Sequence, residues 1–149
     1  MRLLFKKLRE NAVIPKYQTE YSAGLDLCAC VDGEISIPAG ETVKVPTGLA
    51  AELEGEKNAV LLIYARSSLA TKLGLAPANC VGVVDWDYRG ELIVALHNAS
   101  AEDRVIQNGD RIAQLVVTPI YRPEVCESDE LSDTARGAGG FGSTGLRNS

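Results

Sequence analysis

The stretch from Val81 to Leu96, VGVVDWDYRGELIVAL, decides the fold class of this 149-residue chain. Its two apolar runs, VGVV and ELIVAL, are short, rich in Val, Ile and Leu, and separated by a polar cluster that ends at Gly90. Short apolar runs bounded by turn residues are typical of strands. We therefore predict a β-hairpin with the polar cluster Asp85–Arg89 at its tip.

The same pattern recurs along the chain, with short apolar runs between Gly, Pro, Asn and Asp residues. This punctuation predicts an all-β domain of barrel or jelly-roll type. One segment, Ser67–Leu73, lacks strand features and predicts one short helix, the only helix that we expect. The predicted strands are Leu3–Lys6, Glu34–Ile37, Thr42–Pro46, Leu49–Leu53, Ala59–Tyr64, Val81–Val84, Leu92–His97 and Arg111–Pro119.

The composition excludes several classes of protein. A chain of this length with 46% hydrophobic and 23% charged residues is one globular domain with a core of its own. The formal charge of −5 argues against a nucleic-acid partner, because binding along a nucleic-acid backbone requires clustered Lys and Arg. No apolar run approaches the roughly 20 residues that span a bilayer, and the N-terminus lacks signal-peptide features. We expect a cytoplasmic protein with no membrane partner.

The cysteines and the single histidine do not indicate disulfides, a zinc site or a His-dependent catalytic site. Because a core of this size needs no disulfides, we expect Cys28, Cys30, Cys80 and Cys126 to be reduced thiols. The Cys28-x-Cys30 pair has no second pair beside it, which argues against a structural zinc site. We interpret His97, at the end of a predicted strand, as structural. Without it, Ser-His-Asp and Cys-His catalytic sets lack a member.

The C-terminal segment RGAGGFGSTG, which starts at Arg136, has five glycines in ten residues and no core of its own. Composition alone favours a disordered terminus. However, Arg136, Ser143 and Thr144, together with backbone N–H groups made accessible by the glycines, are groups that bind phosphate. Phe141 is a ring among glycines that cannot bury it, so it needs a surface on which to dock.

Two further segments contain candidate catalytic or phosphate-binding groups. Asp85 and Asp87 are two apart, so they share one face of an extended backbone, and a general base needs one carboxylate aimed at a water. The alternative is a solvated turn. Arg66, Ser67 and Ser68 lie where a strand meets the predicted helix, a place that attracts anions, although a simple helix cap by Ser fits equally well.

Read in order, the segments AGLDL, ARSSLA, GVVDWDYRGEL, NGDRIAQL and RGAGGFGSTG resemble the five motifs of the trimeric dUTP pyrophosphatases (dUTPases). The resemblance covers Ala23 to Gly145. It implies a distorted β jelly roll of the β-clip type and a homotrimer with three sites at subunit interfaces. It also implies a β domain over residues 1–132, followed by a swapped glycine-rich lid over residues 133–149 that is flexible without ligand and closes the site of another subunit.

The function that the resemblance implies is that of a dUTP diphosphatase. Such an enzyme hydrolyses dUTP to dUMP and pyrophosphate, which supports dTTP synthesis and keeps uracil out of DNA. Asp85 matches the carboxylate that activates a water for attack on the α-phosphorus. The implied cofactor is Mg²⁺, held by the three phosphates, with Asp26 and Gln114 touching its water shell and no direct protein ligand expected.

The resemblance also assigns the substrate contacts. Asn79 and the backbone of Val83 and Val84 match the slot that reads the uracil edge, and Tyr88 matches the ring beneath the deoxyribose. Phe141 matches the ring that stacks on uracil. The full implied substrate-binding set is Arg66, Ser67, Ser68, Asn79, Val83, Val84, Tyr88, Gln114, Arg136, Phe141, Gly142, Ser143 and Thr144.

Two alternatives remain. A dCTP deaminase is similar in fold and in its Arg-Ser-Ser segment, but it carries a different region where this chain has DWDYRGEL. A dUTPase-like nucleotide-binding regulator would be expected to carry an insert or a damaged motif, and neither is visible here. The departures from the motifs are small: Trp86 fills a variable position, and Ala65 stands where relatives often have Gly or Pro.

Overall fold

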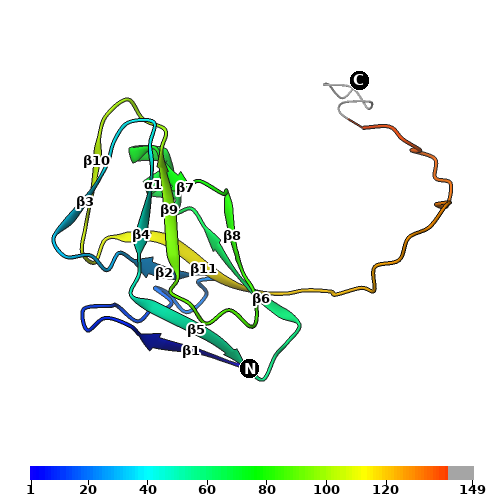
Figure 1. Cartoon of the computed structure of the whole chain (residues 1–149), viewed down its shortest axis with the longest axis horizontal. Coiled ribbons are helices and arrows are strands. Elements are labelled where there is room, and N and C mark those ends of the chain that lie inside the picture. Colours follow the sequence, from blue (N-terminus) through cyan, green and yellow to red (C-terminus); the bar gives the residue numbers. More distant parts are fainter. Residues whose placement is uncertain (141–149) are drawn as a thin grey trace.

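The computed structural model describes residues 1–140 of the chain. This part is built of short strands with one helix, which confirms the all-β prediction (Figure 1). The helix is α1 (Ser67–Leu73). The strands are β1 (Arg2–Lys7), β2 (Leu25–Cys28), β3 (Glu34–Ile37), β4 (Thr42–Pro46), β5 (Leu49–Glu54), β6 (Ala59–Tyr64), β7 (Leu75–Pro77), β8 (Val81–Val84), β9 (Ile93–Asn98), β10 (Arg104–Gln107) and β11 (Arg111–Pro119).

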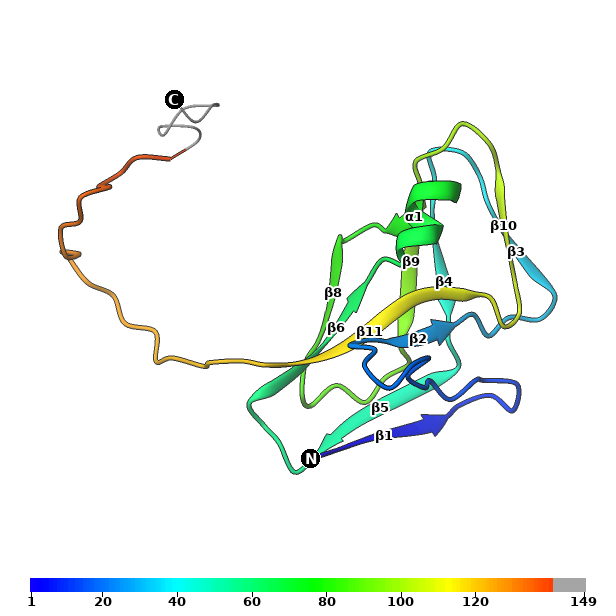
Figure 2. The same ribbon diagram turned by 180° about the vertical axis from the view of Figure 1, so that it is seen from behind.

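The strands form two main antiparallel sheets, in the orders β2-β11-β6-β8 and β4-β9-β7. Two further antiparallel pairs, β1-β5 and β10-β3, extend this framework. In Figure 1, β9 crosses in front of β11, and in the reverse view of Figure 2 it lies behind β11. The sheets are therefore stacked as two layers, as in a jelly roll.

The core lies between the two layers and follows from alternation along the strands. In β2, Leu25 and Leu27 are buried while Asp26 between them is partly exposed. In β9, Val94 and Leu96 are buried on the same principle. A shift by one residue would move these apolar side chains to the outer face, so burial fixes the strand register. The fully buried apolar residues include Leu27, Ile37, Leu49, Leu75, Leu92, Leu96, Ile106, Ile112 and Leu115.

The predicted elements are largely confirmed. All eight predicted strands are present with ends within one residue, and the helix is present with the predicted bounds. Three strands, β2, β7 and β10, were not predicted. Each has four residues or fewer, β7 ends in a proline, and β2 contains a carboxylate, so their apolar patterns are too short to stand out.

The predicted hairpin over Val81–Leu96 is wrong. Strand β8 pairs with β6, whereas β9 pairs with β4 and β7, so this stretch crosses from one sheet to the other. The crossing starts with a turn, in which the Tyr88 N–H donates to the Asp85 carbonyl at 3.1 Å. Two apolar runs predict two strands, but they do not predict which strands will pair with them through backbone hydrogen bonds. The turn also separates Asp85 from Asp87, so they do not share an extended face.

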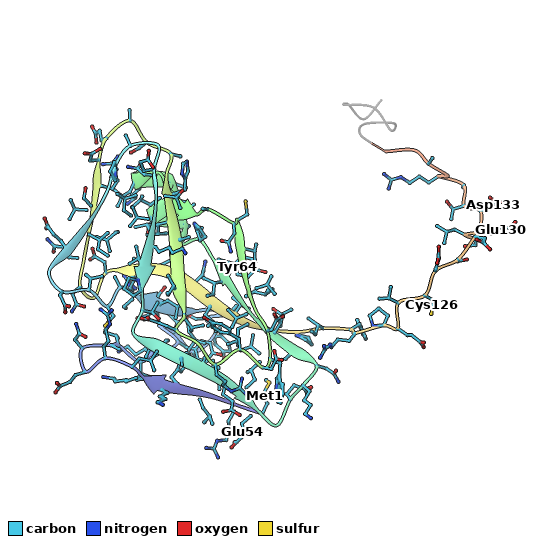
Figure 3. All side chains as sticks on the ribbon, viewed as in Figure 1. Met1, Glu54, Tyr64, Cys126, Glu130 and Asp133 are labelled. Carbon is cyan, nitrogen blue, oxygen red and sulfur yellow. The ribbon has the colours of Figure 1, made fainter. Side chains whose placement is uncertain are left out.

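After β11 the chain leaves the body. The Ile120 N–H donates to the Asn58 carbonyl at 2.9 Å, and the side chains of residues 121–138 are exposed. Figure 3 shows Cys126, Glu130 and Asp133 on this segment, away from the sheets. The helix of the described part, α1, has seven residues and is far shorter than the roughly 20 that cross a bilayer.

Asn98, at the end of β9, is a fully buried polar residue that connects three segments. Its Nδ2 donates to the carbonyls of Ile37 (2.9 Å) and Glu102 (2.8 Å). Its Oδ1 accepts hydrogen bonds from the N–H (3.0 Å) and hydroxyl (2.7 Å) of Ser100. One amide thus satisfies the backbone of β3 and of the loop that leads to β10.

We expect Asn98→Ala to lower the free energy of unfolding by about 1–3 kcal/mol, because the substitution leaves buried carbonyls and an N–H without partners. Urea denaturation at fixed protein concentration measures this change. Ser36→Ala, on the exposed face of β3, is the control. Equal unfolding midpoints for Asn98→Ala and the wild type would contradict this interpretation of Asn98.

Candidate functional site

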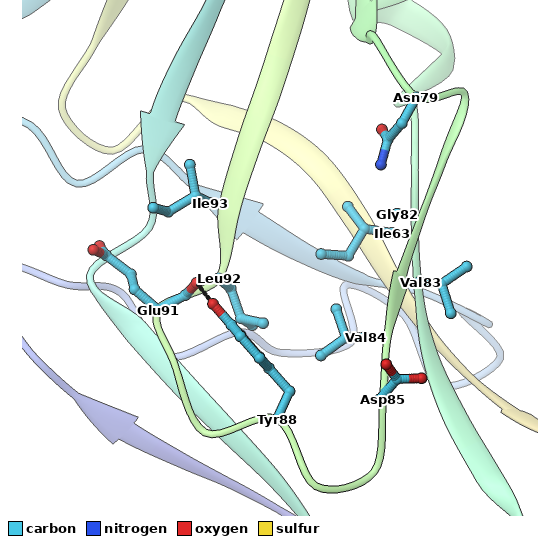
Figure 4. A pocket seen from close by; sticks show the side chains of 10 residues that line it. All are labelled: Ile63, Asn79, Gly82, Val83, Val84, Asp85, Tyr88, Glu91, Leu92 and Ile93. Atoms are coloured by element: carbon cyan, nitrogen blue, oxygen red, sulfur yellow. Dashed lines mark hydrogen bonds between the residues drawn. The ribbon is translucent and has the colours of Figure 1, made fainter.

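A pocket with a volume of about 250 Å³ lies between β8 and the start of β9 (Figure 4). It contains five of the residues predicted for the site: Asn79, Val83, Val84, Asp85 and Tyr88. In Figure 4, Asn79 stands at one end of β8 and Asp85 at the other, while Tyr88 faces β8 from across the pocket. The remaining lining residues are Ile63, Gly82, Glu91, Leu92 and Ile93.

Strand β8 forms the wall of this pocket with its backbone. It lies at the edge of its sheet and pairs with β6 on one side, so within residues 1–140 its other edge faces no strand. Free N–H and C=O groups along an edge can pair with a planar ligand as they would with another strand. A Cβ at Gly82 would crowd the Ile63 Cβ at 3.2 Å and lie 3.7 Å from the Asn79 amide nitrogen, so the glycine keeps β8 close to β6 beside these two pocket residues.

Asn79 reaches the pocket through a tight turn after β7. The Cys80 N–H donates to the Pro77 carbonyl at 3.0 Å, and Cys80 has a φ of 62°, in the left-handed region. This conformation costs a non-glycine residue energy, and the Ala78 N–H, which donates to the Ala95 carbonyl at 2.8 Å, ties the turn to β9. The turn places the exposed Asn79 amide, which can both donate and accept, beside the edge of β8.

Asp85 lies where β8 ends, with an exposed carboxylate. Among the described residues, its side-chain oxygens have no hydrogen-bond or ion-pair partner, so both oxygens can accept from a water. Asp87 does not line this pocket. The geometry therefore separates the two aspartates and leaves Asp85 as the carboxylate available for base chemistry here.

Trp86 anchors the turn that carries Asp85, a role that the sequence did not reveal. Its indole N–H donates to the Leu53 carbonyl at 3.1 Å, and its ring packs against the core. The Lys57 ammonium and the Arg89 guanidinium lie 5.2 and 5.6 Å from its ring centroid. Arg89 also donates to the Trp86 carbonyl at 2.7 Å. The one signal was that Trp86 is the chain's single tryptophan.

A second polar cluster forms around Asp26 on β2. One carboxylate oxygen accepts from Arg66 Nε at 2.7 Å and the other from Arg111 Nη1 at 3.0 Å. The Asp26 and Arg66 side chains are only 12% and 20% exposed, so this pairing holds Arg66 more firmly than a surface pair would. A bulge in β11 just after Arg111 shifts the register opposite β2.

Gln114 joins this cluster through the sheet. It lies opposite Asp26 in β2 and opposite Tyr64 in β6, so three strands bring these residues into one row. Its Nε2 donates to the Ala65 carbonyl at 2.8 Å, which fixes the chain just before Arg66. Three of the five sequence segments thus converge at one end of the four-stranded sheet.

The serines beside Arg66 do not cap α1. The N-cap residue is Arg66, which makes no side-chain capping bond, so the interpretation of Ser as a simple helix cap is wrong. Ser67 and Ser68 are exposed, and in the described part of the chain their hydroxyls have no hydrogen-bond partner. Both hydroxyls are therefore available to a ligand.

The other predicted site residues lie at or beyond the end of the described chain. Arg136 is exposed on the segment after β11, and its Nε donates to the Gly139 carbonyl at 2.8 Å. Phe141, Gly142, Ser143 and Thr144 lie outside the described residues. His97 lies on β9, with Nδ1 3.1 Å from the Thr42 hydroxyl, and does not line the pocket.

The described residues around Asp26 do not offer the ligand set of a direct Mg²⁺ site. Among residues 1–140, no three acidic, His or Cys side chains gather into a metal-binding group. Asp26 uses both carboxylate oxygens on arginines, whereas the Gln114 Oε1 makes no hydrogen bond within this range. Mg²⁺ keeps several waters and binds phosphates readily, so these groups fit contact through water better than direct coordination.

Burial raises the pKa of the Cys28 thiol, and the neighbouring Asp26 carboxylate raises it further. Because the thiolate is the reactive form, we expect iodoacetamide at pH 8 to modify the exposed Cys80 and Cys126 well before Cys28. Mass spectrometry of peptides from timed samples measures the order. Modification of Cys28 as fast as that of Cys80 would contradict this prediction.

The pocket thus combines the edge of β8, the Asn79 amide, apolar lining residues and the free Asp85 carboxylate. It is suited to a small planar ligand whose reactive part lies beside Asp85. Solved structures share the fold. A mutant dUTPase of Staphylococcus bacteriophage 80alpha, with dUpNHpp, matches with a TM-score of 0.88 and 25% identity, over 97% of this chain and 99% of that one.

Sequence comparisons agree. The chain is 50% identical over 133 residues to the deoxyuridine 5'-triphosphate nucleotidohydrolase of Desulfitobacterium hafniense, covering 89% of this chain and 87% of the relative. It is 51% identical over 145 residues to that of Wolinella succinogenes, covering 97% and 95%. Residues 10–145 match the family described as dUTPase. The chain belongs to the dUTPase family, as the five sequence segments predicted.

Proposed function

We propose that this protein hydrolyses dUTP to dUMP and pyrophosphate, and so supplies the precursor of dTTP and limits uracil in DNA. Membership of the dUTPase family supports the overall reaction. The single observation that supports the site is the pocket along β8, with Asn79 at one end and Asp85 at the other. A nucleotide with its base at Asn79 would direct its phosphates towards Asp85.

In this proposal the base is read by the edge of β8. The backbone groups of Val83 and Val84 and the amide of Asn79 would exchange hydrogen bonds with the uracil edge, as neighbouring strands do. A site built to pair with a polar edge rejects a base whose donors and acceptors differ, because buried groups would then stay unpaired. The Tyr88 ring would lie beneath the deoxyribose. Phe141 would cover the base from the other side.

Asp85 is the proposed general base. Its free oxygens would accept a proton from a water, and that water would attack the α-phosphorus with pyrophosphate as the leaving group. Bound Mg²⁺ would neutralise charge on the phosphates and orient them. On the protein side, Gln114 would meet the water shell of the ion through Oε1. Asp26 is proposed to reach the same shell while it holds Arg66 in place.

The position of Arg66 supports a site shared between copies of the chain. Within one chain, Tyr64 pairs with Val81 and Leu61 pairs with Val84. Arg66 comes two residues after Tyr64, so it lies near the end of β8 that is close to Asn79. Arg66 then lies roughly 16 Å along β6 from the residue opposite Val84. The phosphates would point the other way, towards Asp85. Arg66, Ser67 and Ser68 would therefore bind the phosphates of a site whose β8 belongs to another copy.

We therefore propose a homotrimer with three shared sites. The segment from residue 133 to 149 would be a lid swapped between subunits, with Arg136, Gly142, Ser143 and Thr144 on the β- and γ-phosphates. The exposed course of residues 121–138 away from their own body supports this lid. A cytoplasmic location completes the proposal, since the exposed thiols of Cys80 and Cys126 suit a reducing compartment.

The test is product analysis with Mg²⁺ and either dUTP or dCTP. The proposal predicts dUMP and pyrophosphate from dUTP. Ammonia release from dCTP would instead establish the deaminase alternative. Tight dUTP binding without turnover would establish the regulator alternative.

A further inference from the structure

The position of the Tyr88 ring depends on the absence of a side chain at residue 90. A Cβ added to Gly90 would lie 2.6 Å from Tyr88 Cζ and 3.0 Å from Cε2, with the hydroxyl also in contact. Carbon atoms pack at about 3.5–4.0 Å, so a methyl group and the ring cannot both occupy this space. Gly90 does not have a positive φ, so backbone conformation does not explain the glycine. Its role is to leave room for the ring.

The hydroxyl end of the same ring is also held. Tyr88 donates its O–H to the Glu91 carbonyl at 3.0 Å, the bond drawn in Figure 4. The Glu91 carboxylate in turn accepts from the Gly48 N–H at 2.8 Å. Glu91 therefore joins the ring to the turn between β4 and β5.

That turn is a rigid support. Thr47 and Leu49, on either side of Gly48, are fully buried. The Thr47 hydroxyl donates to the Leu92 carbonyl at 2.7 Å, and the Leu92 N–H donates to the Leu49 carbonyl at 2.8 Å. These bonds fix the backbone at Leu92, on one side of Glu91, so the bond from Gly48 to the Glu91 carboxylate is what anchors Glu91 itself to this support. The tether on Tyr88 thus ends in the core rather than in a mobile loop.

We infer that Gly90 and Glu91 are positioning residues that set the pocket's preference for 2'-deoxyribose over ribose, because together they fix the tilt of the Tyr88 ring. The inference rests on the proposed function, in which this ring lies beneath the sugar. A ring with room on only one side and a tethered hydroxyl cannot move aside for an extra hydroxyl group. A ring displaced by a methyl group can make that room, and so can a ring whose Glu91 carbonyl has lost the side-chain anchor to Gly48.

The measurement is the ratio of kcat/KM for dUTP to that for UTP, together with the Kd values of dUMP and UMP from calorimetry. We expect Gly90→Ala and Glu91→Ala each to lower the selectivity ratio by about tenfold or more, the scale of steric discrimination between small groups in a pocket. Glu91→Gln should restore the wild-type ratio, because an amide oxygen can still accept from Gly48. Glu54→Ala, on the exposed end of β5, is the matched control.

A role in general packing alone would lower activity towards both nucleotides equally and leave the ratio unchanged. Unchanged ratios in both Gly90→Ala and Glu91→Ala would therefore overturn the inference, and if Gly90→Ala does not fold, Glu91→Ala decides. A wild-type protein that does not hydrolyse dUTP refutes the proposed function separately. In that case the Kd ratio of dUMP to UMP, compared between wild type and Glu91→Ala, still decides the role of Glu91.

Discussion

Asp85→Asn is expected to lower the turnover of dUTP by about 10²- to 10⁴-fold, the usual contribution of a general base. Asparagine keeps the shape of the side chain but cannot take a proton from water. Because Asp85 makes no side-chain bonds within the described residues, the substitution should leave the fold and nucleotide binding close to those of the wild type.

Single-turnover pyrophosphate release, with dUMP affinity measured in parallel, separates chemistry from binding. Asp87→Asn is the matched control, since Asp87 is two residues away, is also exposed and does not line this pocket. Turnover of Asp85→Asn within a few fold of the control would remove Asp85 from its proposed role.

Deletion of the chain after Asp133 is expected to leave a folded protein with turnover reduced by at least about tenfold. Residues 121–138 are exposed and add nothing to the core, so the unfolding temperature should change by only a few degrees. The deletion removes Arg136 and the proposed lid, which would otherwise close the site around the phosphates. Thermal unfolding and pyrophosphate release test both parts, and failure to fold would contradict the lid.

The sequence predicted most of the fold because alternation along the strands is a local property. Strands β4, β6 and β11 appear with the predicted bounds, as does α1. Strand partners are not local. VGVV and ELIVAL look like two arms of a hairpin, yet β8 completes one sheet and β9 lies within the other. Nothing in either run specifies that the polar cluster between them bridges the two layers.

The pocket residues were predicted through resemblance to known motifs, and the structure brings Asn79, Val83, Val84, Asp85 and Tyr88 together. The residues that support them were missed. Trp86 acts through the Leu53 carbonyl, and Glu91 acts through its own carbonyl and the Gly48 N–H. Every residue type has a backbone carbonyl, and every type except proline has a backbone N–H. A side chain that bonds to the backbone therefore does not restrict the residue type of its partner, and the sequence does not reveal such contacts.

The central claim is that each active site combines Asp85 of one copy with the lid of another. The measurement is pyrophosphate release by an equimolar mixture of Asp85→Asn and the chain truncated after Asp133, refolded together. Shared sites predict recovered activity, because about one site in four would combine an intact Asp85 with an intact lid in randomly assembled oligomers. A mixture no more active than the sum of its two components would contradict the claim.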